Sequence, residues 1–493
     1  MNKSFNLIDK PWIPVSLRGE VSLLQVFTDV SIKELSGTVL ENLSIFKLLL
    51  AISQAAFTPK DDEEWKKTNL EDFGTRVVNY LSKHHDLFDL YSEKPFLQFP
   101  ILKEKNDPKK IRPLRLLLPE VGSSNNPVLT DYNIQNVELD SVKARLLLQQ
   151  MNFAFGGKKV DQKICLSQGH KKSAAGANGV SLGKNGFLHS YYFGNSLLET
   201  IFLNLMTQSD IAQVQVYESG IGTPPWECMP KGEIDDIAMK LKNSYMGHLV
   251  GLNRFCLLQD DSIITTEGIN YPSIKDGVAD LSVSTFIRNF SKKSEIDAVW
   301  ANPEQKPWRQ LSSILSFLHS NSTIYGCKQI RLPMSRITSK GIPYCIWSLG
   351  IQVLWNSGEY YVKQKCDSLS SVIRLPNHEE QLSTWFDTFE TEVKSLEHLM
   401  MKLRSSVSGY FKDLSVENIS TENVERQFWE SCNDLSDELI RACFLNKTLD
   451  FRKKVSSIAE NLYNATCDSS TARQILSWSK HQLNLSKYRA GEK

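Results

Sequence analysis

The sequence predicts an α+β fold, with a large mixed N-terminal domain at residues 1–375 followed by a C-terminal four-helix bundle at residues 376–493. First, a chain of 493 residues is longer than a chain that ordinarily folds around one hydrophobic core, so more than one domain is expected. Second, proline is absent after Pro376, and glycine then occurs only at Gly409 and Gly491. Third, this last part carries four apolar stripes at helical spacing, whereas upstream segments mix helical and strand patterns.

The first half of the chain combines one hairpin with several helices. Alternating residues around Arg18-Gly19 predict a β-hairpin. Apolar residues at spacings of three and four predict helices, with Pro59 just after the first. The predicted helices are residues 41–57, 65–83, 141–155 and 195–206.

The next part favours strands. Residues 247–258 predict a turn leading into a strand or short helix, and residues 310–318 predict a helix. Loose alternation predicts strands in residues 263–299, with a basic β-hairpin candidate at 287–293. Residues 342–362 alternate around Asn356-Ser357-Gly358, which is a strong hairpin turn signal.

The C-terminal part carries the four stripes of the predicted bundle. Helical spacing runs through the apolar residues of each stripe, and short polar segments separate the stripes. The stripes span residues 382–407, 424–444, 451–463 and 472–485.

Composition excludes several classes of protein. A hydrophobic content of 41% and a charged content of 23% are typical of a soluble globular protein. The formal net charge is +1, so nucleic-acid binding would require local basic patches. The sequence contains no run of eighteen apolar residues, so we expect no membrane span. The nine cysteines form no C-x-x-C pair, so we expect no zinc site, and with no signal peptide we expect reduced thiols in the cytoplasm.

Residues 167–192, which we call the glycine–lysine stretch, stand out between two helical patterns. Gly, Ala, Asn and Ser at this density predict an exposed loop. Lys171, Lys172 and Lys184 add positive charge, and glycine lets a polyanion approach the backbone N–H groups. A phosphate or nucleic-acid contact and a flexible surface insertion are both open. A P-loop is disfavoured because Asn185, rather than Ser or Thr, follows Lys184.

Two further basic segments have the same two interpretations. Residues 103–115 carry Lys109 and Lys110 between two prolines and predict either a solvated loop or a phosphate-contacting arm. Arg452, Lys453 and Lys454 begin the third predicted bundle helix. They form either a solvated face or a contact to the DNA backbone.

The sequence contains no recognisable catalytic set. It has no H-E-x-x-H, no G-x-S-x-G and no H-x-E with C-x-x-C, and its nine histidines show no metal-ligand spacing. The pairs Asp61-Asp62 and Asp235-Asp236 are expected on solvated faces. We therefore expect a binding protein rather than an enzyme, without a cofactor or metal.

Several short motifs, in order, resemble the large subunit, called CasA, of the type I-E CRISPR Cascade surveillance complex. The opening NLIDKPWIPV is similar to the family's start, and LLLAISQAAFTPKDDEEW is similar to its apolar helix with an acidic tail. YSEKPFLQ and TPPWE match two further family segments, and a helical bundle closes the chain. The resemblance covers nearly the full length, and the order and spacing of the motifs carry it.

The resemblance implies a non-catalytic subunit in RNA-guided antiviral defence. Such subunits recognise the protospacer-adjacent motif (PAM) in double-stranded DNA, promote duplex opening and R-loop formation, and recruit a helicase-nuclease. The implied partners are the DNA target, the CRISPR guide RNA, the other Cascade subunits and the helicase-nuclease, in the cytoplasm and without a membrane.

The resemblance also implies roles for individual residues. The family's motif-reading loop falls at residues 174–184, and a basic finger falls near residues 286–293. The family's wedge, a hairpin tip that splits the duplex, falls at residues 352–358, and residues 121–130 correspond to a segment that contacts the guide RNA and neighbouring subunits. The implied motif-binding residues are Gly176, Asn178, Gly179, Lys184, Arg288, Lys292 and Lys293. The implied wedge residues are Gln352 and Asn356, and the implied contacts to the guide RNA or a neighbouring subunit are Gly122, Asn125 and Asn126. The candidate contacts to the DNA backbone are Lys109, Lys110, Lys171, Lys172, Arg452, Lys453 and Lys454.

Two rival functions remain open. One is a scaffold or adaptor that contacts only proteins through the helical bundle. The other is a nuclease whose catalytic carboxylates are dispersed along the sequence, since catalytic residues need not be close in sequence.

Overall fold

The structure is a computed structural model. It describes residues 3–105, 112–118, 139–156, 164–170, 178–272, 274, 280–290, 293–318, 326–342, 344–356, 359–362, 368–375, 379–416 and 420–491. Within these ranges only the backbone is described for residues 112, 115–116, 287–290, 293–294, 356, 359 and 379–381. The chain forms two compact units: the first is mainly Met1–Pro307 with the segment up to Val372, and the second is mainly Ile373–Lys493 with Trp308–Ser312.

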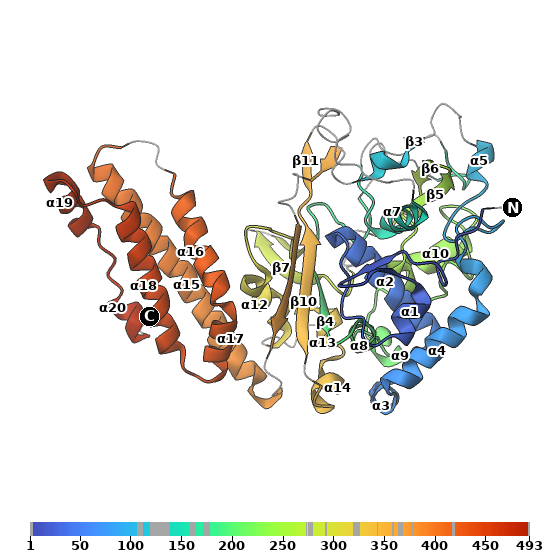
Figure 1. Cartoon of the computed structure of the whole chain (residues 1–493), viewed down its shortest axis with the longest axis horizontal. Helices are drawn as coiled ribbons and strands as arrows, with labels where there is room; N and C mark the ends of the chain where they lie inside the picture. The colour runs from blue at the N-terminus through green and yellow to red at the C-terminus, as the bar shows by residue number, and fades with distance from the viewer. Residues whose placement is uncertain are drawn as a thin grey trace. The chain divides into compact units, whose positions relative to one another are not determined.

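Helix α2 (Val39–Ala56) is the core element of the first unit. Its N-terminus is fixed by a capping box, in which Thr38 and Glu41 each accept a hydrogen bond from the backbone of the other. It is buried nearly all round and packs against α4 (Leu70–Lys83), α7 (Asp140–Asn152), α8 (Leu197–Leu203), α11 (Tyr245–Leu249) and strand β10 (Cys345–Ile351) (Figure 1). In length and apolarity it could cross a membrane, but 78% of it is buried inside the protein, as in the core helix of a soluble protein.

The N-terminal third of the first unit is mostly helical. The β1–β2 hairpin pairs Ile13 with Val21 and Val15 with Gly19, which confirms the turn predicted at Arg18-Gly19. The helix predicted at 65–83 is two helices, because Asn69 caps a new helix by accepting a hydrogen bond from the Asp72 N–H. The elements are β1 (Ile13–Val15), β2 (Gly19–Val21), α1 (Leu23–Thr28), α3 (Asp62–Lys67), α4 (Leu70–Lys83), η1 (His85–Phe88), α5 (Leu102–Lys105), β3 (Arg112–Pro113), η3 (Leu114–Leu117) and α7 (Asp140–Asn152).

Small antiparallel sheets make up the rest of the first unit. In the described residues, β10 lies between β13 and β4, β6 between β3 and β5, and β7 between β8 and β9, and β11 pairs with β12 alone (Figure 1). The strands are β4 (His189–Phe193), β5 (Arg254–Gln259), β6 (Ser262–Glu267), β7 (Ser284–Phe290), β8 (Lys293–Ala298), β9 (Gly326–Cys327), β10 (Cys345–Ile351), β11 (Leu354–Asn356), β12 (Glu359–Tyr361) and β13 (Ser368–Arg374).

Short helices connect these strands. The helix predicted at 310–318 reduces to one short α-helix between two 3₁₀ turns. The elements are α8 (Leu197–Leu203), α9 (Gln208–Ala212), α10 (Asp236–Lys242), α11 (Tyr245–Leu249), η5 (Pro307–Gln310), α12 (Leu311–Ile314), η6 (Ser316–Leu318), α13 (Lys328–Arg331) and α14 (Met334–Ser339).

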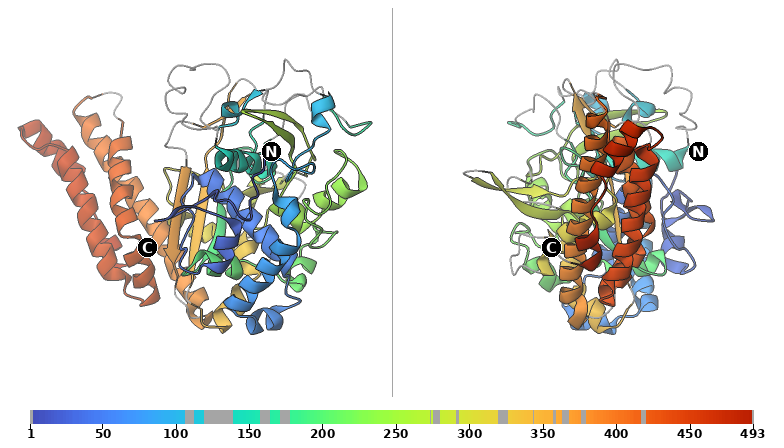
Figure 2. Two further views of the ribbon diagram at one scale, coloured as in Figure 1. Left: turned by 45° about the vertical axis from the view of Figure 1, so that its right-hand side comes forward. Right: turned by 90° about the vertical axis from the view of Figure 1, so that its left-hand side faces the viewer.

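The second unit is helical. Its longest helices lie lengthwise beside one another (Figure 2), and α15 packs against α16, α17, α18 and α19. The second predicted helix is interrupted at Leu435, where α16 ends and α17 begins. The helices are α15 (Glu379–Asp413), α16 (Glu422–Asp434), α17 (Ser436–Phe444), α18 (Thr448–Thr466), α19 (Ala472–Lys480) and α20 (Ser486–Ala490).

The predicted α+β class with a helical C-terminal part is therefore confirmed. Both later hairpins also form: β7 pairs with β8, and β11 pairs with β12. Ser357 and Gly358 of the predicted turn between β11 and β12 lie outside the described residues.

Candidate nucleic-acid interface

The expectation of an exposed loop over residues 167–192 is wrong for much of the described part, because residues 181–182 and 186–192 are buried and the last of them enter strand β4. We call residues 164–170, which begin just before the stretch, its upstream stem, and residues 178–186 its downstream stem. In the downstream stem, the Asn178 side chain accepts from the Gly156 N–H and donates to the Gly183 carbonyl, both at 2.7 Å. The Gly179 N–H donates to the Ala154 carbonyl, and a Cβ on Gly179 would lie 2.0 Å from the Asn152 carbonyl oxygen. Both residues thus hold the stem against the end of α7, a structural role that the sequence did not predict. Their contact with DNA stays a prediction.

The downstream stem also contacts the base of the β11–β12 hairpin. The backbone N–H of Val353 donates to the carbonyl of Asn185 at 2.9 Å. Gly186 adopts a positive φ of +84°, and a Cβ there would lie 1.7 Å from the carbonyl oxygen of Ile351. Only glycine allows this approach. Asn185 and Gly186, directly after the predicted reading loop, therefore join it through backbone to the base of the predicted wedge hairpin, and no side chain fits at Gly186.

The same segment holds the base of the β7–β8 hairpin, the predicted basic finger. The N–H of Ala301 donates to the Gly186 carbonyl at 2.8 Å, and the N–H of Leu188 donates to the Val299 carbonyl at 3.0 Å. Further along, the N–H of Ser190 donates to the Ser282 carbonyl at 2.8 Å. Two hairpins that are far apart in sequence, β7–β8 and β11–β12, are thus anchored on residues 185–190.

At the β11–β12 hairpin, Leu354 pairs with Tyr361 and Asn356 pairs with Glu359. The structure places Gln352 just before the hairpin, half-buried, and Asn356 at its end. Trp355, between them, has 60% of its surface exposed. Sequence reasoning missed Trp355, although a tryptophan next to an Asn-Ser-Gly turn is a signal for an aromatic side chain near a hairpin tip.

Lys184 lies at the exposed turn of the downstream stem, next to exposed Asn185. In the basic hairpin, the backbone register pairs Arg288 with Glu295 and Lys293 with Phe290. Nine predicted contact residues lie outside the described residues: Gly176, Lys171, Lys172, Lys292, Gly122, Asn125, Asn126, Lys109 and Lys110.

In the second unit, Arg452 corrects one prediction. Its side chain is 8% exposed and forms a two-pronged ion pair with Glu392, with Nη2 2.7 Å from Oε1 and Nε 2.9 Å from Oε2. A guanidinium that is buried and paired in this way cannot reach a phosphate, so the prediction for Arg452 is wrong. Lys453 and Lys454 are exposed and pair with Asp450 and Glu438, so they remain candidates.

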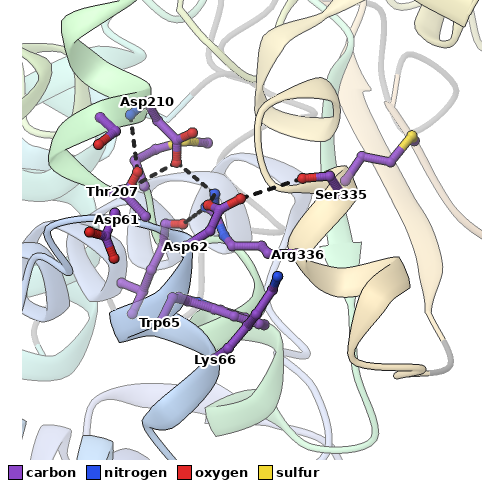
Figure 3. A network of polar contacts seen from close by, with 12 residues as sticks. Asp61, Asp62, Trp65, Lys66, Thr207, Asp210, Ser335 and Arg336 are labelled. Atoms are coloured by element: carbon purple, nitrogen blue, oxygen red, sulfur yellow. Dashed lines mark hydrogen bonds and ion pairs between the residues drawn. The ribbon is translucent and has the colours of Figure 1, made fainter.

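A polar network around Arg336 corrects the expected solvation of Asp61-Asp62 (Figure 3). The fully buried Arg336 guanidinium donates to Asp62 at 2.9 Å and to Asp210 at 2.8 Å. Asp61 caps α3 by accepting from the Glu64 N–H. In the other predicted solvated pair, Asp235 caps α10 in the same way, whereas Asp236 is exposed, as predicted. Apart from that of Asp236, these carboxylates stabilise helix ends and helix packing, since each is occupied by a donor from the protein.

A metal site needs several ligand side chains close together. No group of three or more His, Cys, Asp or Glu side chains among the described residues could hold a metal ion. Burial lowers the pKa of His189 and of His248 to about 4, so both imidazoles are neutral near pH 7.

Comparisons with known proteins agree on one family. The family model described as CRISPR-associated protein Cse1 matches residues 6–469. A curated relative from Thermus thermophilus, CRISPR-associated protein CasA/Cse1, is 32% identical over 232 residues, which cover 44% of this chain and 42% of that relative. The alignment thus spans less than half of the relative's length.

Solved structures extend the likeness of fold to nearly the whole chain. Thermobifida fusca Cse1 matches with a TM-score of 0.73 at 18% identity, over 99% of this chain and 97% of that one. Thermus thermophilus CasA (Cse1) matches with a TM-score of 0.70 at 19% identity, over 97% and 98%. A chain of a CRISPR RNA-guided surveillance complex matches with a TM-score of 0.68 at 14% identity, over 99% of both. The family model spans most of the sequence, so the chain belongs to the CRISPR-associated protein Cse1 family, which confirms the resemblance to CasA.

Proposed function

We propose that this chain is the non-catalytic large subunit of an RNA-guided CRISPR surveillance complex. In that complex, which we place in the cytoplasm, it recognises the PAM in double-stranded DNA, promotes duplex opening and R-loop formation, and recruits a helicase-nuclease. Membership of the Cse1 family supports the assignment to a Cascade complex. Pairing with the guide RNA then reads the target, and this chain reads only the short motif and the shape of the duplex beside it.

The observation that carries the proposal is the shared anchor at residues 185–190. The Asn185 carbonyl holds the base of the β11–β12 hairpin, and Gly186 and Leu188 hold the end of the β7–β8 hairpin. A subunit that reads a motif and opens the adjacent base pairs needs both functions at a fixed separation. Backbone hydrogen bonds hold both hairpins on residues 185–190, which continue directly from the loop at residues 174–184, so the loop and the two hairpins share one fixed base.

Each element has a proposed role. The loop at residues 174–184 reads the motif in the minor groove through Gly176, Asn178 and Gly179, and Lys184 contacts a phosphate. Arg288, Lys292 and Lys293 of the basic hairpin contact the DNA backbone.

The β11–β12 hairpin supplies the wedge. Gln352 lies just before it and Asn356 lies on it, and exposed Trp355 offers a flat surface on which an unpaired base can stack. Residues 121–130, with Gly122, Asn125 and Asn126, contact the guide RNA or a neighbouring subunit.

The experiment is a binding assay with the complex assembled on a guide RNA. Duplexes that match the guide and carry a randomised flank are bound, separated and sequenced. The proposal expects enrichment of a short flanking motif with this chain present, and no enrichment without it. The same enrichment in its absence would contradict the proposal.

The two rival functions are further outcomes of the same work. A protein-only scaffold would restore assembly of the complex but leave the flanking sequence unselected. A nuclease would cut DNA as the purified chain alone in Mg²⁺ or Mn²⁺.

A further inference from the structure

Two buried carboxylates, Glu233 and Asp280, hold the stems of the glycine–lysine stretch. Neither residue belongs to the stretch, and neither stood out in the sequence. Each has less than a tenth of its surface exposed. Buried carboxylates are rare unless every oxygen is paired, so the partners of these two residues indicate what they do.

Glu233 holds the upstream stem. Its Oε1 accepts from the Leu166 N–H at 2.7 Å, and its Oε2 accepts from the Ser167 N–H. The Ser167 hydroxyl oxygen in turn accepts from the Ile234 N–H at 3.1 Å. A carboxylate that accepts from two successive N–H groups fixes the direction of the chain there, three residues before the stem ends at His170.

Asp280 holds the downstream stem. Its Oδ2 accepts from the Ser181 hydroxyl at 2.8 Å, and its Oδ1 accepts from the Ser282 N–H at 3.1 Å. Ser181 is fully buried, and its carbonyl accepts from Nε2 of His189 at 2.7 Å. Because a carbonyl can only accept, the proton of this neutral imidazole must sit on Nε2.

Lys47 of helix α2 keeps Asp280 ionised. Burial favours the protonated form of Asp280, but the ammonium group of Lys47 forms a buried ion pair with it and holds the pKa of Asp280 well below its usual range. The downstream stem is thereby tied to the central helix of the first unit. A pair buried this deeply restricts geometry more than it adds stability.

We propose that Glu233 and Asp280 are positioning residues that set the two stems of the glycine–lysine stretch at the separation needed to read the motif. This inference rests on the proposed function, because it assigns these side chains to the same reading site. They touch no DNA themselves; they act through Leu166, Ser167 and Ser181. Changes at either residue therefore reduce discrimination between motifs, while general affinity for DNA is retained.

The test uses the assembled complex with Glu233→Gln, whose amide NH₂ would face one of the two N–H groups and leave it unpaired. A second variant, Ser181→Ala, removes the hydroxyl that donates to Asp280 and that also accepts from the Asn152 side-chain amide at 3.2 Å. The matched control is Glu64→Gln in α3, which also replaces a carboxylate that accepts from a backbone N–H, that of Lys60 at 2.7 Å, away from both stems.

The measured quantity is the ratio of the Kd for a duplex without the motif to the Kd for a duplex with it. A partly misfolded subunit lowers both affinities together, so the ratio reports positioning rather than stability. We expect the ratio to fall about tenfold for Glu233→Gln and several-fold for Ser181→Ala, and to stay within about twofold for Glu64→Gln.

The outcomes separate this inference from the proposed function. If the wild-type complex discriminates and both stem variants discriminate equally well, the positioning role is wrong and the motif-reading function stands. If the wild-type complex binds both duplexes equally, the motif-reading function itself fails, and the positioning role with it.

Discussion

The carbonyl of Asn185 accepts a 2.9 Å hydrogen bond from the backbone N–H of Val353. This bond joins the downstream stem of the glycine–lysine stretch to the residue just before strand β11, across more than 160 positions of sequence. Gly186 beside it packs so closely on the Ile351 carbonyl that no side chain fits. A shift of one element must therefore move the other, which is what a device that couples motif reading to strand separation requires.

Gly186→Ala should separate these two elements. The new Cβ would lie 1.7 Å from the Ile351 carbonyl oxygen, at a φ of +84° that already strains an alanine. We expect a loss of about 3 kcal/mol or more in the free energy of unfolding, and weaker duplex opening in the assembled complex. The control is Gly220→Ala, which has a φ of +63° but nothing within 4 Å of its Cβ, and should cost only about 1–2 kcal/mol. Equal losses in urea unfolding would contradict the close approach.

Trp355→Ala should weaken binding to opened DNA and leave the fold intact. The side chain is 60% exposed, so its removal costs little core packing, whereas stacking on a base is worth about 1–3 kcal/mol. We expect a Kd increase of about tenfold for a duplex with unpaired bases beside the motif, and partial recovery with Trp355→Phe. Leu476→Ala, at a residue 73% exposed in the second unit, serves as the control. An unchanged Kd for Trp355→Ala would remove this residue from the interface.

Lys184→Ala should reduce the salt dependence of DNA binding. Lys184 is exposed at the turn of the downstream stem, and each phosphate contact that is lost lowers the slope of log Kd against log salt by about one unit. The effect should be similar for duplexes with and without the motif, because a phosphate carries no sequence information. Lys487→Ala, at an exposed lysine of α20, is the matched control and should leave the slope unchanged. Identical slopes for both variants would show that Lys184 touches no phosphate.

Arg452→Met should destabilise the helical unit rather than weaken DNA binding directly. It leaves the Glu392 carboxylate buried without its partner, which costs about 3–5 kcal/mol. The double variant Arg452→Met with Glu392→Leu should recover most of that loss in thermal unfolding, since no charge then stays buried. A folded Arg452→Met protein of normal stability with weakened DNA binding would restore the role first predicted for Arg452.

Much of the fold could be predicted because its signals are local. The pairing of β11 with β12, the hairpin at Arg18-Gly19 and the helical stripes after Pro376 were all signalled by residues close to one another in sequence. No proline or glycine marks the interruption at Leu435, so the spacing of apolar residues predicted one helix over residues 424–444 where the structure has two.

The site was predictable only in its elements, not in the roles of single residues. Arg452 was predicted as a DNA contact from its residue type, but Glu392, distant in sequence, occupies its guanidinium. Asn178 stays a predicted contact, and its hydrogen bonds to Gly156 and Gly183 add a structural role that its residue type did not reveal. Glu233 and Asp280 were missed for the same reason: an acidic residue becomes a clamp only when the fold brings backbone N–H or hydroxyl groups to it.

The most direct test of the central claim places a fluorescent base analogue, 2-aminopurine, at the first base pair beside the motif and follows its fluorescence as the complex binds. The account predicts a rise in fluorescence, which reports unstacking, only when this chain is present and only on duplexes that carry the motif. The rise should be reduced by Gly186→Ala. The same rise without this chain, or on duplexes that lack the motif, would contradict the account.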